Sequence, residues 1–331
     1  MPRHCRTPKS RPSFAALGLS LIMSLTLLSG CGNSDQDHTI RIALNPWPGY
    51  EYLYLAEQKG FFKEEGANIE IVQLMSLSDS QRAYTNGRVD GLASTLIEAV
   101  QAEPLGGAPL SVILVSDFSN GGDVILANNE IDNMSALKGK TVGAELSSLG
   151  LFVLQRALTR HGMTLEDVRL VNTEQAQGLN ALQQGRIDAF VTYPPESLNI
   201  LNQGGYQQIF DSSEIPFEII DTLAIAKHIL QAKPELPGQI HRAWQKALDY
   251  TKHNPDDALQ IMAERQGITV EEFQAVTNDL FIIDSSSQAN LLNDPLKIET
   301  SAKAVCKTLV HTGALQIDCN QMKPIAWKGA Q

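Results

Sequence analysis

The segment YTNGRVDGLAST, residues 84–95, is typical of a helix end that leads through a tight turn into a buried strand. Its first glycine stands where helices commonly end on a left-handed residue, and small apolar residues follow the Arg-Val-Asp step. The same arrangement returns as LQQGRIDAFVTY, residues 182–193, which begins 98 residues further along the chain. A repeat at this spacing predicts two successive units of one strand–helix–strand design.

The sequence before each copy matches as well. Ile40–Leu44 predicts a strand, followed by a polar turn and a helix over Glu51–Lys59. Lys140–Glu145 predicts a strand that starts 100 residues later, again followed by a turn and by a helix over Leu149–His161. Further expected elements are a helix over residues 79–86 and strands over residues 68–73, 89–94, 111–116, 124–127 and 221–226. Short apolar strands that alternate with helices predict an α/β fold with parallel sheets covered on both faces.

Two such units predict two lobes with a ligand cleft between them, at the carboxyl ends of the strands. The C-terminal part is mostly helical and is expected to pack back onto the first lobe. The chain would then cross between the lobes near residues 119–124 and again near residues 216–222. We therefore expect lobe 1 to comprise residues 40–120 and 222–331, and lobe 2 to comprise residues 121–221.

Residues 1–30 are expected to be a secretory leader. Four basic residues and no acid precede Phe14–Leu28, an apolar run that is short for a transmembrane helix. The run ends in Leu-Ser-Gly-Cys, which resembles the lipobox of bacterial lipoproteins, in which Cys31 would receive the lipid. Residues 31–39 would then form a polar tether to the membrane. A plain signal peptide with an incidental cysteine is the alternative.

Charge and cysteine content fit an address outside the cytoplasm. Acidic residues outnumber basic ones by 37 to 26, and loss of the leader would take the net charge from −11 to about −15. Such a surface excludes nucleic-acid binding through a basic patch. Cys306 and Cys319 would remain as one even pair, which favours a structural disulfide over two buried free thiols in an oxidising compartment.

Sequence signatures of catalysis are missing. The chain has no G-x-S-x-G, H-E-x-x-H or C-x-x-C motif, and its histidines lack ligand-like spacing, so we expect neither a metal nor another cofactor. Gly139-Lys140-Thr141 suggests a P-loop, but Met134 stands where that motif needs glycine. These three residues also precede a strand, whereas a P-loop opens a helix. The P-loop interpretation is rejected.

The turn NPWPGY, residues 45–50, would lie at the carboxyl end of the first strand and so at the cleft. Proline restricts the backbone, glycine permits close approach, and Trp47 and Tyr50 would lose little entropy on binding a ligand. The alternative is that Trp47 only covers the core beneath the first helix. In lobe 2 the corresponding turn carries Ser147 and Ser148, which could either cap the following helix or contact a ligand.

Together, the lipobox, the duplicated lobes and NPWPGYEYLYLAEQKGFF resemble the periplasmic substrate-binding proteins of ABC importers, in their nitrate/sulfonate/taurine and thiamine-pyrimidine branch. The resemblance spans residues 39–315 and also rests on DFSNGGDVIL and LKGKTVGAELSS. It implies a bilobal fold of the type II periplasmic-binding-protein class, which closes on a small molecule and delivers it to permease and ATPase subunits. We expect a monomer anchored to a bacterial membrane only through lipid. The implied cleft residues are Trp47, Tyr50, Ser94, Thr95, Asp117, Ser147, Ser148 and Tyr193.

The ligand and the exact role stay open at this point. A sulfonate or nitrate needs donors and preferably an arginine, whereas the cleft segments carry Glu98, Asp117, Asp123 and Glu145. Aromatic rings with carboxylates favour a neutral or cationic nitrogenous ligand, such as a pyrimidine or an amine. The pyrimidine synthases that resemble these binding proteins carry a cysteine-rich iron motif, which this sequence lacks, so no enzyme is expected. A sensor lipoprotein that presents its ligand to a membrane receptor is the alternative function.

Overall fold

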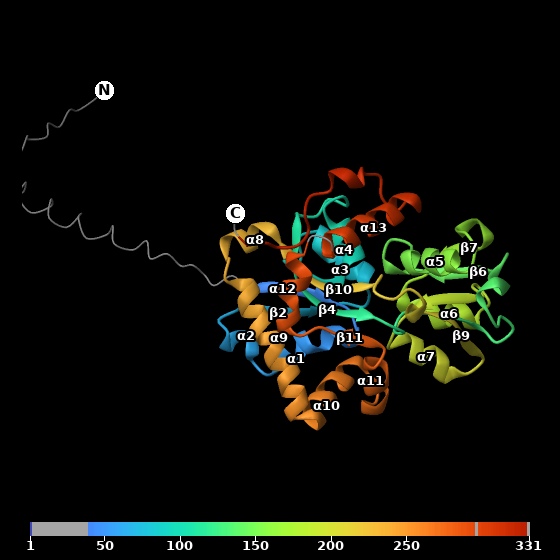
Figure 1. Cartoon of the computed structure of the whole chain (residues 1–331), viewed down its shortest axis with the longest axis horizontal. Helices are drawn as coiled ribbons and strands as arrows, with labels where there is room; N and C mark the ends of the chain where they lie inside the picture. Colours follow the sequence, from blue (N-terminus) through green and yellow to red (C-terminus); the bar gives the residue numbers. More distant parts are fainter. Residues whose placement is uncertain (2–38, 295–296, 330–331) are drawn as a thin grey trace, which may run out of the picture. The chain divides into compact units, whose positions relative to one another are not determined.

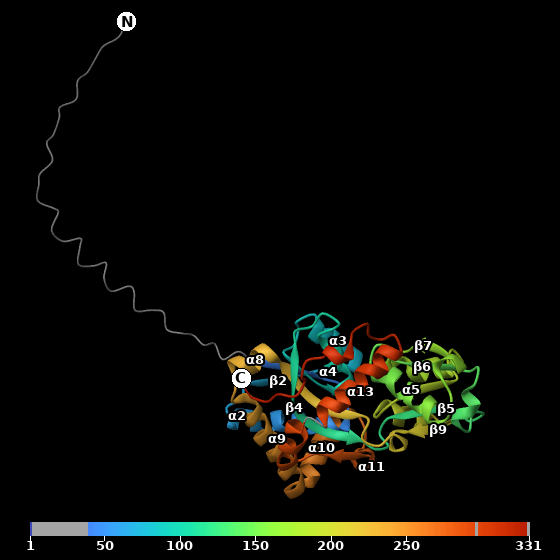
Figure 2. The ribbon, with the colours of Figure 1, turned by 45° about the horizontal axis from the view of Figure 1, so that its top comes forward.

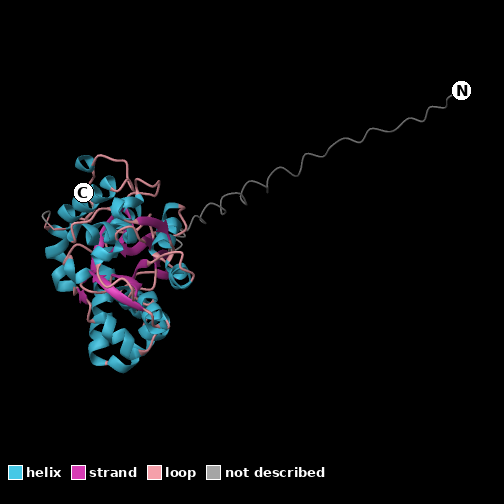
Figure 3. Cartoon of the chain, turned by 90° about the vertical axis from the view of Figure 1, so that its right-hand side faces the viewer, coloured by secondary structure: helices cyan, strands magenta, loops and turns pink. Residues whose placement is uncertain are grey.

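The structure is a computed structural model that describes Met1, residues 39–294 and residues 297–329. The expected leader, the lipidation site Cys31 and the tether up to residue 38 lie outside the described residues. The described residues from Thr39 onward form one compact unit that contains two β-sheets. Strands lie in the interior of this unit and helices on its outside, as Figure 3 shows.

The first sheet has six strands in the order β11-β4-β10-β3-β1-β2. Their bounds are β1 Ile40–Leu44, β2 Ile69–Gln73, β3 Gly91–Thr95, β4 Leu110–Ser119, β10 Ile220–Ala226 and β11 Leu280–Ile282. The second sheet has five strands in the order β7-β6-β8-β5-β9. Their bounds are β5 Val124–Asn128, β6 Thr141–Ala144, β7 Arg169–Asn172, β8 Ala189–Thr192 and β9 Tyr206–Asp211. The elements of the second sheet lie together on one side of the unit in Figures 1 and 2.

The helices cover both sheets and fill the connections between strands. Their bounds are α1 Glu51–Gln58, α2 Phe61–Glu64, α3 Leu77–Thr85, α4 Leu96–Ala102, α5 Leu149–Arg160, α6 Gly178–Gln183, α7 Glu196–Gln203, α8 Lys227–Ala232, α9 Leu236–His253, α10 Pro255–Gln266, α11 Val270–Thr277, α12 Ser285–Asn293 and α13 Ile298–His311. Helix α3 starts earlier than predicted because the Ser76 side chain accepts a hydrogen bond from the Asp79 amide and caps it.

The predicted α/β fold with two sheets is confirmed, and both sheets are mixed. Strands β2, β1 and β3 run parallel, as do β7, β6 and β8, but β10 and β5 run antiparallel to their neighbours. The reason lies in the direction of entry. Strand β10 starts beside Thr95, the last residue of β3, and β5 starts beside Thr192, the last residue of β8. A chain that enters a sheet at the carboxyl edge of its parallel strands must run opposite to them.

The two copies of the sequence repeat adopt the same structure. The order β10-β3-β1-β2 in the first sheet corresponds to β5-β8-β6-β7 in the second. Gly87 and Gly185 both have a φ of 65°, the left-handed conformation that the sequence predicted. Both copies therefore turn from helix to strand through the same backbone geometry.

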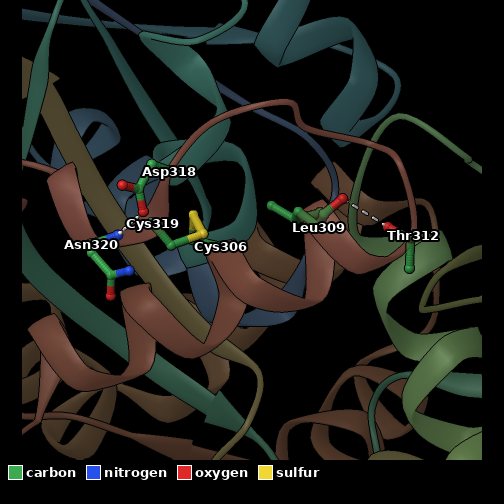
Figure 4. The surroundings of a disulfide bond; sticks show 6 residues. All are labelled: Cys306, Leu309, Thr312, Asp318, Cys319 and Asn320. Carbon is green, nitrogen blue, oxygen red and sulfur yellow. Dashed lines mark hydrogen bonds between the residues drawn. A yellow bond between two sulfur atoms is a disulfide. The ribbon is translucent and has the colours of Figure 1, made fainter.

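The C-terminal helices pack on the elements of the first sheet. Helix α9 contacts α1 and α2, and its residues Ile240, Trp244 and Ala247 are fully buried. Strand β11 pairs with β4, so this mostly helical part also adds one short strand. Cys306 on α13 and Cys319 are joined as a disulfide, as Figure 4 shows, and hold the end of the chain against this helix.

Candidate ligand-binding site

The turn after β1 is rigid and its aromatic side chains are buried. Trp47 has an extended backbone, and Pro48–Tyr50 form one turn of 3-10 helix, closed by a hydrogen bond of 3.0 Å from the Tyr50 amide to the Trp47 carbonyl. Gly49 is required here, because a Cβ atom on it would lie 1.9 Å from Oδ2 of Asp117. The turn can therefore lie directly against the carboxylate of Asp117 only with glycine at this position.

A cavity with an empty volume of about 180 Å³ lies between elements of the two sheets. The sequence-predicted residues Trp47, Tyr50, Thr95 and Tyr193 line it. The complete lining is Asn45, Trp47, Tyr50, Leu77, Thr95, Asp123, Leu149, Tyr193 and Asp221. Of this volume, which includes open solvent, only about 10 Å³ admits the centre of a water-sized sphere, so the cavity holds about one water molecule and would have to open to admit a ring-sized ligand.

Trp47 lies between the two sheets and does more than cover the core. Its indole Nε1–H donates to Oδ1 of Asp117 at 3.2 Å, and its ring meets the Tyr193 ring edge to face, with centroids 5.9 Å apart. The Tyr193 hydroxyl in turn accepts from Nδ2 of Asn45 at 3.3 Å. These contacts join the first strand of one sheet to the end of β8 in the other.

Asp117 and Ser94 lie behind the cavity lining. The Asp117 carboxylate accepts from Trp47 and from the Ser116 hydroxyl, the latter at 2.9 Å, and so orients the tryptophan. The Ser94 hydroxyl donates to the Thr95 carbonyl at 3.2 Å, and its own carbonyl accepts from Thr222. Both predicted residues are therefore buried supports of the residues that line the cavity.

The two serines at the start of α5 differ in position. Ser148 is buried, and its hydroxyl donates to Oε1 of Glu98 at 2.9 Å. The amide of Leu149 donates to the same oxygen at 3.0 Å. Ser147 is exposed, with its hydroxyl 3.4 Å from the Ser78 hydroxyl. Of this pair, only Ser148 lies close to the cavity lining, and a carboxylate of the protein already occupies its hydrogen bond.

Sequence reasoning missed Asn45 and Asp221 as lining residues. Asp221 was expected at the start of a strand, which in a parallel sheet lies at the edge away from the cleft. Because β10 runs antiparallel, Asp221 pairs with Thr95 and its side chain reaches the cavity. The position of Asp221 at an expected crossing between the lobes could have indicated this, because a chain that returns to the first lobe enters its sheet at the edge that faces the cleft. Asn45 precedes Pro46 in the quoted turn and carried no separate signal.

Five buried carboxylates surround the cavity: Glu98, Asp117, Asp123, Glu145 and Asp221, each at most 2 % exposed. Burial raises the pKa of Asp117 and the pKa of Asp123 to about 7. Burial raises the pKa of Glu145 to about 8. Burial, with the nearby charge of Asp117, raises the pKa of Asp221 well above its usual range. Each of these groups is costly to ionise here until a ligand supplies a compensating charge or donor.

The free acceptor atoms of the cavity lining belong to three residues. Oδ2 of Asp123, Oδ2 of Asp221 and Oδ1 of Asn45 have no hydrogen-bond partner among the described residues. The other Asp221 oxygen accepts the hydroxyl proton of Tyr50. Among the described residues, no lysine, arginine or histidine lines the cavity. The site offers acceptors and aromatic surface, and this arrangement suits N–H donors on a flat or positively charged ligand.

The two chain crossings are tied together beside the cavity. The hydroxyls of Ser119 and Ser212 lie 2.7 Å apart, and the amide of Gly121 donates to the Ser212 hydroxyl at 2.7 Å. Gly121 has a φ of 129°. A Cβ on Gly122 would lie 2.7 Å from Cη2 of Trp47. Both glycines therefore have a structural requirement at the point where the chain leaves β4 for β5.

Two absences concern only the part of the chain that the structure describes. Within it, no group of three or more histidine, cysteine, aspartate or glutamate side chains is arranged to hold a metal ion. Nor does any helix of this part combine the length and hydropathy needed to span a bilayer.

Sequence comparison finds relatives that match most of this chain. The formylaminopyrimidine-binding protein of Halalkalibacterium halodurans is 25% identical over 261 residues, which cover 75% of this chain and 78% of that protein. The 4-amino-5-hydroxymethyl-2-methylpyrimidine phosphate synthase of Aspergillus parasiticus is 27% identical over 230 residues, covering 64% of this chain and 66% of that enzyme.

Solved structures share the fold at low sequence identity. The periplasmic aliphatic sulphonate-binding protein SsuA of Escherichia coli superposes with a TM-score of 0.68 at 17% identity, covering 85% of this chain and 96% of that one. The periplasmic nitrate-binding protein NrtA of Synechocystis PCC 6803 gives 0.66 at 13% identity, covering 85% and 83%. These likenesses establish a periplasmic-binding-protein fold. The family model described as NMT1/THI5 like matches residues 47–258, and the chain belongs to that family.

Proposed function

We propose that this protein is the substrate-binding protein of an ABC importer and that it captures a neutral or cationic nitrogenous molecule, such as an aminopyrimidine or an amine. The observation that carries the proposal is the pair of unpartnered acceptors, Oδ2 of Asp123 and Oδ2 of Asp221, in an aromatic cavity whose described lining has no basic residue. A relative named for formylaminopyrimidine binding supports the same class of ligand.

Each lining residue has a role in this proposal. Trp47 and Tyr193 offer ring surface to a flat heterocycle, and the N–H groups of the ligand would donate to Asp123 and Asp221. Tyr50 holds the second oxygen of Asp221 and so fixes the direction of the first. Asp117 keeps the indole of Trp47 in place from behind. The ligand would stabilise the closed arrangement through contacts with both sheets.

The wider setting is also a proposal. We assign residues 40–120 and 222–331 to one lobe and residues 121–221 to the other, with the tied crossings at Ser119 and Ser212 as the hinge. A lipidated Cys31 would hold the protein at a bacterial membrane on its periplasmic side, and the loaded form would dock as a monomer onto permease and ATPase subunits.

We further propose that the protein binds its ligand without converting it. Several relatives are named as pyrimidine phosphate synthases, so this point needs a test of its own. Incubation of the purified protein with a bound pyrimidine, followed by mass spectrometry of the released compound, should return the compound unchanged. A new mass in the released fraction would show turnover and contradict this part of the proposal.

The ligand class is tested by thermal unfolding and calorimetric titration of the purified protein. The panel is 4-amino-5-hydroxymethyl-2-methylpyrimidine, spermidine, methanesulfonate and nitrate. A ligand present at a hundredfold over its dissociation constant adds about 2.7 kcal/mol of stability, which raises the melting temperature by several degrees. We expect this increase for the pyrimidine or for the amine.

The residues are tested by substitution. Asp123→Asn and Asp221→Asn should each weaken the binding, because an amide cannot replace the charge of a carboxylate toward a cation. Asp256→Asn, at the exposed start of α10, is the matched control and should bind as the wild type does. Binding of methanesulfonate or nitrate by the wild type, with no response to the nitrogenous compounds, would refute the proposed ligand class.

A further inference from the structure

One carboxylate of the cleft accepts hydrogen bonds, across the cavity, from the start of a helix beside the other sheet. Glu98 lies on α4, which follows β3 of the first sheet, and its side chain reaches the start of α5 beside the second sheet. Oε1 of Glu98 accepts from the Ser148 hydroxyl at 2.9 Å and from the Leu149 amide at 3.0 Å. Oε2 accepts from the Thr95 hydroxyl at 2.5 Å. The carboxylate thus has three donors and is fully buried.

The start of α5 is the position in this cleft where an anion would otherwise be stabilised. The first amides of a helix have no partner within the helix, and the helix dipole places partial positive charge there. Helix α5 has twelve residues, and its first amide points to Glu98. The serine hydroxyl beside it adds a second donor to the same oxygen. The protein therefore fills this position with its own carboxyl group, whose pKa is raised by burial.

We propose that Glu98 determines the ligand specificity of the cleft: by occupying the start of α5 it excludes anionic ligands, such as nitrate and sulfonates, from the position that would stabilise them. This inference rests on the proposed function in taking the cavity between the sheets as the ligand site. It adds the residue that discriminates between nitrogenous ligands and anions.

The electrostatics of the surrounding residues support this role. An anion that entered the wild-type cavity would find Glu98 already bonded to Ser148 and Leu149, and no basic residue among the described lining residues to replace them. The other acids around the cavity repel an anion only when they are ionised. Burial raises the pKa of Asp123 to about 7 and that of Glu145 to about 8, so both are mostly neutral at pH 6. Asp117, whose pKa burial raises to about 7, behaves in the same way, and burial also raises the pKa of Asp221.

The decisive variant is Glu98→Ala, which frees the Ser148 hydroxyl and the Leu149 amide and leaves space for a small anion. Calorimetric titration at pH 6 with nitrate, methanesulfonate and acetate should show binding at least tenfold tighter than for the wild type. Glu98→Ser is the second variant and should show the same gain if Glu98→Ala lacks a cooperative unfolding transition. Glu98→Gln fills the same space with a neutral group and should show no gain.

Glu145→Ala is the matched control. Glu145 is a buried acid in the same cleft, and its carboxylate oxygens have no hydrogen-bond partner among the described residues. Its removal therefore takes a buried glutamate side chain of the same size out of the cleft without freeing the start of α5. We expect Glu145→Ala to bind these anions no better than the wild type.

The outcomes separate this inference from the proposed function. Unchanged anion binding in the folded Glu98→Ala or Glu98→Ser protein overturns the inference, as does an equal gain in Glu145→Ala or in Glu98→Gln. Millimolar binding of methanesulfonate by the wild type at pH 6 overturns it as well. Another outcome is that the wild type binds neither the pyrimidine nor spermidine, while the Glu98→Ala variant binds nitrate more tightly than the wild type does. That combination would refute the proposed ligand class and support the role of Glu98.

Discussion

The two edges of each sheet use aspartate in opposite ways. At the edge where the parallel strands begin, Oδ2 of Asp90 accepts from the Arg41 amide at 2.8 Å, and Oδ2 of Asp188 accepts from the Thr141 amide at 2.8 Å. At the edge where they end, Oδ2 of Asp123 and Oδ2 of Asp221 have no partner among the described residues. The first pair fastens one strand to the next. Each carboxylate of the second pair is buried at the cavity and has one oxygen without a hydrogen-bond partner.

The two halves of the molecule are alike at the first edge and differ at the second. Strand β3 ends in Ser94-Thr95 and continues into α4 with Glu98, whereas β8 ends in Thr192 and is followed by Tyr193 and Pro194. One half thus brings a carboxylate to the cavity and the other an aromatic ring. The duplicated frame is set by residues before the strands, and under our proposal the ligand is selected by residues immediately after them.

The largest expected effect is the pH dependence of the ligand-free protein. The folded pKa values of Asp117, Asp123 and Glu145 are raised to about 7, 7 and 8, so the folded state keeps protons that the unfolded chain has already released. Stability is therefore lost as the pH rises from the unfolded pKa values, about 4, to these folded values, by about 1.4 kcal/mol per pH unit for each such proton. Thermal unfolding should give a melting temperature that falls from pH 5 through pH 7 and levels off above about pH 8.

The same titration distinguishes the two kinds of aspartate. Asp123→Asn removes a buried carboxylate with one unpartnered oxygen, so its melting temperature should depend less on pH than that of the wild type and should lie higher at pH 8.5. Asp188→Ala should keep the wild-type slope. A rising melting temperature in the wild type over this interval would contradict the burial of these acids.

Substitution of Gly49 comes next in size. In Gly49→Ala the new Cβ would overlap Oδ2 and Cγ of Asp117, at 1.9 and 2.6 Å, and would displace the Trp47 turn. Such overpacking costs about 1–3 kcal/mol. If that cost falls on the closed site, the affinity for the bound panel compound drops roughly 5- to 150-fold. Gly143→Ala on β6 is the comparison, because its Cβ would meet Ile187 at 2.7 Å, away from the cavity lining. Calorimetry should find near-normal affinity there and weak affinity in Gly49→Ala; equal affinities would remove the turn from the site.

Substitution of Asp90 or Asp188 should lower the stability less than substitution of Gly49, and by the same amount at both positions. Asp90→Ala and Asp188→Ala each remove one acceptor from a main-chain amide, which costs about 0.5–1.5 kcal/mol for a net hydrogen bond. Urea denaturation should show the same loss for both, and titration should show unchanged ligand affinity. A clear inequality between the two would mean that the halves are less alike than their matching distances indicate.

Ser147→Ala should have the smallest effect of all. The side chain is exposed and makes a long contact of 3.4 Å with Ser78, so its removal should change the stability by less than about 0.5 kcal/mol. Affinity for the panel compound should stay at the wild-type value. Ser148→Ala serves as the contrast. It removes the hydroxyl that donates a hydrogen bond to buried Glu98, so it should lower the stability measurably. Weaker ligand binding in Ser147→Ala would return this residue to the site.

Much of the frame was predictable because it depends on local patterns. The GR(V/I)D segments indicated the duplicated units, and Gly87 and Gly185 indicated the turns that the structure contains. The turn at Trp47 was placed at the cleft because a strand must end before it. These features depend on periodicity and on backbone conformations that few residues adopt.

Other parts of the site depend on contacts between distant segments, which the sequence does not display. The antiparallel course of β10, which brings Asp221 to Thr95, follows from where the chain re-enters the first sheet. The bond from Glu98 to Ser148 joins residues fifty positions apart across the cavity. Sequence patterns identified Glu98 as an acid near the cleft and Ser148 as a residue at a helix start. They did not indicate that the Glu98 carboxylate accepts hydrogen bonds from the start of that helix.

The most direct test of the central claim is a crystal structure of the protein with the nitrogenous panel compound that binds it most tightly. We expect the compound in the cavity beside Trp47 and Tyr193, with a ligand nitrogen about 2.7–3.2 Å from a carboxylate oxygen of Asp123 or Asp221. Glu98 should keep its bonds to Ser148 and Leu149. A ligand bound elsewhere, or one whose negatively charged group replaces Glu98 at the start of α5, would contradict the claim that this cleft selects nitrogen donors and excludes anions.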